Sequence, residues 1–138
     1  MKILIVMATV GLLTLSAASK MSSTNIGFTT YSEPEMEKYK ACIDACNNCI
    51  ASCKTAEKMC AKDAAMKECH KLCKECISAC EKAIKEMKAE SKNVAKECAS
   101  CAKVCERCAA ECDKYEMAEL KKCAVDCRNA AAHCNDMK

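Results

Sequence analysis

The stretch that decides the fold is residues 41–60, which read ACIDACNNCIASCKTAEKMC. Five cysteines share it, at successive steps of 4, 3, 4 and 7 residues: Cys42, Cys46, Cys49, Cys53 and Cys60. At about 100° per residue, their side chains fall within an arc of about 60° on an α-helix. We therefore interpret this stretch as an amphipathic helix whose apolar stripe consists of thiols.

The same spacing returns three more times along the chain. The repeats comprise Cys69, Cys73, Cys76 and Cys80; Cys98, Cys101, Cys105, Cys108 and Cys112; and Cys123, Cys127 and Cys134, with Ala130 where another cysteine would fall. Such steps of 3 and 4 residues are the core-facing a/d positions of heptads. The pauses between repeats predict helices at 34–61, 64–90, 93–113 and 116–136. Because short connections make consecutive helices antiparallel neighbours, we predict an all-α fold, an antiparallel up-down four-helix bundle with a cysteine-lined core.

Composition supports helices and excludes an ordinary core. The chain has 138 residues, of which 17 are Cys, 2 Gly and 1 Pro, too few turn residues for a β-rich fold. Beyond residue 18, Leu, Ile, Val and Phe together number only 11. A core of thiols with so few branched aliphatics fills space poorly, so packing alone does not explain the cysteines.

Residues 1–18 have the pattern of a secretory signal peptide. Lys2 precedes an apolar run from Ile3 to Leu15, and small residues follow up to Ala18, after which we expect cleavage. The run falls short of the ~20 apolar residues that span a bilayer. We therefore expect an exported protein, periplasmic or extracellular, with no membrane association after cleavage.

The mature chain is expected to have two parts. Residues 19–33 are rich in Ser and Thr and predict a flexible lead-in, and residues 34–138 form the bundle. Ser32 is the candidate N-cap of the first helix, with Pro34 in the first turn. Since Lys2 is the only charged residue of the signal peptide, the mature net charge is +2, too small and too evenly mixed to indicate a nucleic-acid partner.

Three uses of the thiols compete. Disulfides suit an exported protein, but 17 is odd, and stapling four helices does not require a continuous stripe. A zinc or cadmium buffer meets a charge problem: 16 thiolates around four divalent ions would leave about −8 buried, with no Lys or Arg on the stripes. Cu(I) avoids this excess negative charge, because about one monovalent ion per shared thiolate keeps the core near neutral. We therefore predict that each chain binds multiple Cu(I) ions and that all 17 cysteines serve as their ligands.

Other residues are assigned smaller roles. Met66, Met87 and Met137 lie on or near the stripes, where they either fill gaps or form a soft-ligand port for copper. His70 and His133 are expected at the surface, and Tyr39 is expected to plug one end of the bundle. No catalytic triad, phosphate-binding glycine loop or apolar carboxylate pair appears, so we do not expect an enzyme.

The signal peptide followed by four helices with Cys-x-x-x-Cys and Cys-x-x-Cys steps resembles the bacterial copper storage proteins, over about residues 34–137. The resemblance implies a four-helix bundle filled with Cu(I) and assembled as a homotetramer. A copper donor or acceptor protein is a further candidate partner. One departure is the lack of the Arg-Arg pair that exported relatives typically carry. If the chain is exported unfolded, its thiols meet an oxidising space before copper, which keeps a disulfide-stapled structural or interaction protein as the alternative.

Overall fold

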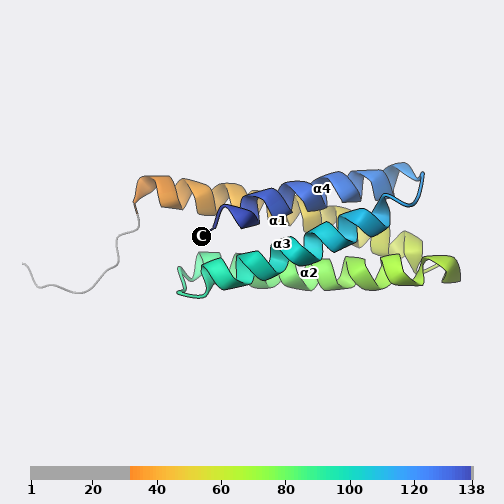
Figure 1. Cartoon of the computed structure of the whole chain (residues 1–138), viewed down its shortest axis with the longest axis horizontal. Helices are drawn as coiled ribbons and strands as arrows, with labels where there is room; N and C mark the ends of the chain where they lie inside the picture. Colours follow the sequence, from red (N-terminus) through yellow and green to blue (C-terminus); the bar gives the residue numbers. More distant parts are fainter. Residues whose placement is uncertain (1–31, 138) are drawn as a thin grey trace, which may run out of the picture.

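The structure, a computed structural model, describes residues 32–137 (Figure 1). Its elements are α1 (Glu33–Cys60), a short 3₁₀ turn η1 (Ala64–Met66), α2 (Lys67–Lys88), α3 (Val94–Cys112) and α4 (Ala118–Asn135). The four predicted helices are confirmed, with every end within three residues of its predicted position, and the second begins as the 3₁₀ turn. The predicted signal peptide (1–18) and all but the last two residues of the predicted lead-in (19–33) lie outside the described residues.

The helices form the predicted antiparallel bundle. In Figure 1 each helix runs opposite to the one before it, and α1 and α3 each contact both α2 and α4. At one end of the bundle, α1 begins, α2 connects to α3 and α4 ends. We call this the N-terminal end. The opposite end holds the α1–α2 and α3–α4 connections. No helix in residues 32–137 combines the length and the apolar character needed to cross a bilayer.

Polar side chains start two of the elements. Ser32 is the N-cap of α1, as predicted, and its backbone N–H donates to Glu35 Oε2 at 3.1 Å. The Asp63 carboxylate caps η1 by accepting the Ala65 backbone N–H at 2.9 Å. Both contacts satisfy backbone donors that a helix start leaves without intrahelical partners, so they fix where each element begins.

The connection from α2 to α3 contains the one residue other than glycine with positive φ among those described, Glu90 at 48°. The Glu90 N–H donates to the Met87 carbonyl at 3.1 Å, and the Ser91 N–H donates to the Glu86 carbonyl at 3.1 Å. These two bonds form a Schellman motif, whose left-handed position is usually glycine because a Cβ is disfavoured there.

We expect Glu90→Gly to stabilise the metal-free bundle by about 0.5–1 kcal/mol, because relief of the left-handed strain outweighs the added freedom of the unfolded chain. Urea unfolding followed by circular dichroism measures the effect. The matched control is Ala89→Gly, one residue earlier at φ −85°, which should destabilise the bundle. Equal losses of stability in both variants would contradict the strain at position 90.

Candidate metal centre

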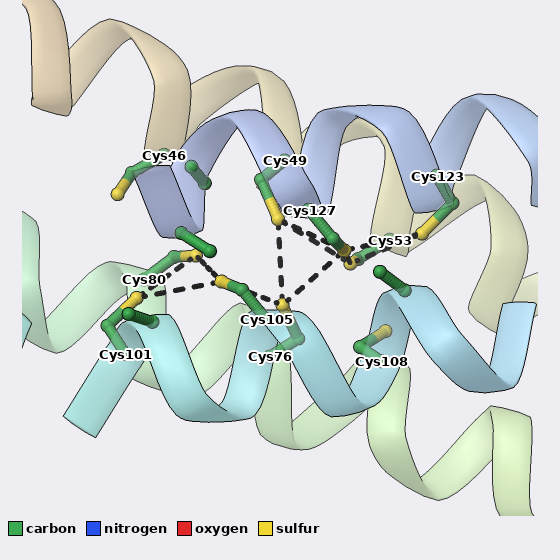
Figure 2. Packing of buried hydrophobic residues seen from close by; sticks show 14 of the residues in the cluster. Cys46, Cys49, Cys53, Cys76, Cys80, Cys101, Cys105, Cys108, Cys123 and Cys127 are labelled. Atoms are coloured by element: carbon green, nitrogen blue, oxygen red, sulfur yellow. Dashed lines mark hydrogen bonds between the residues drawn. The ribbon is translucent and has the colours of Figure 1, made fainter. Parts of the chain in front are cut away.

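All 17 cysteines face the core of the bundle. Each has at most 1% of its surface exposed, and each is a free thiol. The heptad spacing places one stripe of thiols on each helix, and antiparallel packing turns the four stripes toward one another. Figure 2 shows the result: side chains from α1, α2, α3 and α4 converge on a column of sulfur along the bundle axis. We call this set of 17 side chains the thiol column.

Sulfur atoms meet across the helices at van der Waals distance. Fifteen Sγ···Sγ contacts fall between 3.5 and 3.9 Å, twelve of them between helices and three within one helix. In the middle of the column, Cys76 Sγ lies 3.5 Å from both Cys49 Sγ and Cys105 Sγ, and Cys49 Sγ lies 3.5 Å from Cys127 Sγ. These distances exceed the ~2.05 Å of a disulfide, and they leave neighbouring sulfurs able to share a ligand.

The sulfurs form overlapping sets that could hold metal ions. The sets of four whose sulfurs lie within 4.8 Å of one another include Cys49, Cys76, Cys80 and Cys105; Cys49, Cys53, Cys76 and Cys127; Cys53, Cys108, Cys123 and Cys127; and Cys73, Cys108, Cys112 and Cys123. A further set of three comprises Cys42, Cys46 and Cys134. Six cysteines belong to two of the four-membered sets each. The column is therefore a continuous ligand surface rather than a series of separate tetrahedral sites.

The surroundings of the thiol column carry no positive charge. Among the described residues, the only buried polar or charged side chains are Ser52 and Glu111. The Ser52 hydroxyl donates to the Asp126 carboxylate and accepts from Lys122 Nζ at 3.2 Å. Glu111 accepts from Lys114 Nζ at 2.6 Å and from the Tyr115 hydroxyl at 3.4 Å. Both residues thus interact with groups at the surface of the bundle, which we call the rim. The column itself is bordered by Ala, Met and aliphatic side chains.

Protonation of the thiols depends on burial and on their neighbours. Burial raises the pKa of Cys60, because an anion in an apolar core loses its hydration. Interaction with Cys108 raises the pKa of Cys53, whereas hydrogen bonding from Cys105 and then Cys127 lowers that of Cys49. A thiolate inside the column is therefore stabilised chiefly by neighbouring S–H groups. The column contains no cationic side chain to balance a thiolate, so burial favours the protonated form of the metal-free thiols.

Three alanines interrupt the stripes. Ala56, Ala83 and Ala130 occupy positions where the 3/4 spacing would continue, and all three are fully buried. Ala130 is the predicted interruption. The same spacing marks the other two, since position 56 lies between Cys53 and Cys60 and position 83 lies three residues after Cys80.

Ala130→Cys should add one core thiol and raise the Cu(I) capacity by about one ion per chain, because position 130 faces the column. The measurement is anaerobic Cu(I) loading in the presence of a Cu(I)-chelating dye that competes for weakly held ions. The control is Ala132→Cys on the same helix, where the side chain is exposed. Equal gains from both substitutions would contradict the assignment of position 130 to the column.

Apolar side chains close both ends of the thiol column. Half-buried Tyr39 and buried Met87, Val94 and Met137 lie at the N-terminal end, and Met66, Leu120 and half-buried Tyr115 lie at the opposite end. Met66 is therefore separated from the other two methionines of the predicted port. A cavity of about 190 Å³ opens beside Tyr39, Val94 and Met137.

The two histidines lie outside the column. His70 is partly exposed, with Nε2 3.2 Å from Glu57 Oε1. His133 is also partly exposed and borders a surface hollow beside Met137. Both positions agree with the expected surface location.

Comparison with known proteins identifies the fold. A family model described as copper storage protein (Csp) matches residues 35–138. The Cu(I)-bound copper storage protein BsCsp3 is similar, at 32% identity and a TM-score of 0.69, over 72% of this chain and 97% of that one. The apo form of copper storage protein 3 from Bacillus subtilis has 34% identity and a TM-score of 0.68, over 71% and 96%. A protein from Nitrosospira multiformis has 28% identity and a TM-score of 0.67, over 74% and 95%. No curated relative matches the sequence.

A four-helix bundle filled with free thiols defines the class of the protein as a metal–thiolate binder. The chain belongs to the copper storage protein family. This confirms the predicted family, the predicted bundle and the assignment of copper storage. The use of every one of the 17 cysteines as a ligand stays a prediction.

Proposed function

We propose that the chain is a high-capacity store for Cu(I), with the ions held in the thiol column and the thiolates shared between neighbouring ions. The observation that carries this proposal is the overlap of the four-thiol sets, in which Cys49, Cys76 and other members belong to two sets each. Shared ligands permit about one ion per sulfur, whereas separate four-coordinate sites would use four sulfurs per ion.

Charge supports the same ion. When Cu(I) replaces the proton of a thiol, the column stays neutral, so the uncharged surroundings impose no large cost. Thiolates are also soft ligands, which favours Cu(I) among common cellular ions. Copper is the stored cargo here, and the protein supplies ligands in a space from which water is excluded.

Several finer features belong to the same proposal. The signal-peptide pattern of residues 1–18 supports export to the periplasm or beyond, and the family resemblance supports a homotetramer. A copper donor or acceptor would meet the bundle at the N-terminal end, where Met87 and Met137 offer thioethers near a cavity. We propose a binding role without catalysis.

Anaerobic titration of the reduced protein with Cu(I) tests the storage function. We expect uptake of more than about ten ions per chain before a competing Cu(I) chelator takes up copper. Saturation at four or fewer ions would indicate a discrete site or a chaperone and would overturn the proposal.

Thiol counting tests the disulfide alternative. Protein isolated without reductant and then unfolded under anaerobic conditions should give close to 17 reactive thiols per chain, the number present as free cysteines in the structure. A count near one would instead support a stapled structural protein. Replacing Cys73 with Ser separates the two further, because losing a disulfide would cost about 2–5 kcal/mol of stability and losing one ligand of many costs less.

A further inference from the structure

We propose that the thiol column selects its cargo by charge as well as by softness, and that it therefore also sequesters Ag(I) while excluding Cd(II) beyond a few ions. This inference rests on the proposed Cu(I) function and names a second class of cargo for the same site. Ag(I) shares with Cu(I) a single positive charge and a preference for thiolates, whereas Cd(II) shares only the preference for thiolates.

No positive charge in the described part of the chain is buried beside the thiol column. Among the described residues, no Lys, Arg or His side chain is buried. Cations near the rim are paired with carboxylates, as in Lys82 with Glu97 at 2.9 Å and Lys122 with Asp126 at 2.6 Å. The two buried polar residues, Ser52 and Glu111, also have their partners at the rim. Nothing around the column can therefore balance an excess of thiolate charge.

Monovalent and divalent ions leave different net charges in the thiol column. A monovalent ion that replaces one thiol proton changes no charge: R–SH + Ag⁺ gives R–S–Ag + H⁺, with the proton released to buffer and no change of oxidation state. A divalent ion in a four-thiolate site leaves a net charge of about −2, and burying that charge without a partner is costly. Each additional divalent site adds to the same unscreened charge in one narrow column.

The overlap of the sulfur sets also limits how many four-thiolate sites can be filled. Because sets such as Cys49–Cys53–Cys76–Cys127 and Cys53–Cys108–Cys123–Cys127 overlap, filling one four-thiolate site takes ligands from the next. Ions bound by two shared thiolates do not compete in this way, since the 3.5–3.9 Å contacts link sulfur to sulfur along the column. Charge and connectivity thus both favour monovalent soft ions.

The experiment compares three ions on the reduced, metal-free full chain under nitrogen. Cu(I), Ag(I) and Cd(II) are titrated in parallel at constant pH, with bound metal measured after gel filtration and released protons measured by base addition. We expect about ten or more Ag(I) per chain with close to one proton released per ion, and two or fewer Cd(II), because four Cd(II) in four-thiolate sites would already use 16 of the 17 thiols. Ag(I) uptake below about ten, or Cd(II) uptake above two, would overturn the inference.

The Cu(I) arm separates this inference from the proposed function. Normal Cu(I) uptake with little Ag(I) would refute only the extension to silver, and normal Cu(I) uptake with abundant Cd(II) would refute only the charge selection. Poor uptake of Cu(I) and Ag(I) together would refute the storage function as well.

A single substitution sharpens the test. Cys76→Ala removes a thiol that belongs to two of the four-membered sets and should lower Ag(I) uptake by only about one or two ions. The control is Ser100→Ala, at an exposed position of α3, which should leave uptake unchanged. A loss of four or more Ag(I) from Cys76→Ala would show that silver occupies cooperative discrete sites, contrary to the proposal.

Discussion

Loading the reduced protein with Cu(I) should raise its melting temperature by more than about 20 °C. Ions that bind only the folded chain stabilise it by about 2.7 kcal/mol each when their free concentration is a hundred times the dissociation constant, and many ions bind one bundle. For a domain of this size, each kcal/mol shifts the melting temperature by several degrees. We expect the metal-free bundle to have low stability, since among the described residues the only buried branched aliphatic side chains are Leu72, Ile84, Val94 and Leu120.

Differential scanning calorimetry under nitrogen, at increasing copper-to-protein ratios, measures this effect. Binding of copper to thiols of the unfolded chain reduces the shift, so the expected value is a conservative one. The control is the same protein with equivalent potassium chloride, which should leave the melting temperature unchanged. A shift below about 5 °C at saturation would mean that copper binds outside the folded core.

The second large effect concerns the middle of the thiol column. Replacing Cys49, Cys76, Cys105 and Cys127 together with Ala should lower Cu(I) capacity by more than four ions per chain. These sulfurs are in contact with one another and with thiols on either side, such as Cys53 and Cys80, which would lose partners for bridging. The four substitutions divide one column into two shorter groups.

The matched control removes the same number of thiols from the two ends of the column, at Cys42, Cys98, Cys60 and Cys69. Here the loss should be close to four ions, because the middle remains connected. Circular dichroism of both metal-free variants checks folding, since each lost sulfur costs about 1 kcal/mol of burial. Equal losses from the two variants would contradict a continuous, shared cluster.

Much of this architecture could be predicted from local periodicity. The steps of 3 and 4 residues determine which face of each helix is buried. The N-capping residues Ser32 and Asp63 determine where α1 and η1 begin. Both signals depend on a few neighbouring residues, so a single sequence contains them. The same spacing also places Ala56 and Ala83 on the buried face, although the cysteine pattern alone does not mark them.

Other features depend on how the helices are placed relative to one another. The closure of the opposite end by Leu120 and Tyr115, and the contact of Ser52 on α1 with Asp126 on α4, require the axial offset of α3 and α4 against α1. Met66 and Met87 lie at opposite ends of α2, so their separation could be predicted from the sequence. The cavity beside Met137 could not be predicted in this way. Sequence spacing does not encode these offsets, which arise from side-chain packing between helices.

The complete burial of the cysteines also governs their reactivity. An alkylating agent or a small disulfide must approach a sulfur directly, and in the folded metal-free chain each sulfur is covered by other side chains. Modification must therefore wait for the helices to separate, so its rate reports how often the bundle opens. A protein with 17 thiols can in this way stay chemically inert toward reagents that would quickly consume the same thiols in an unfolded chain.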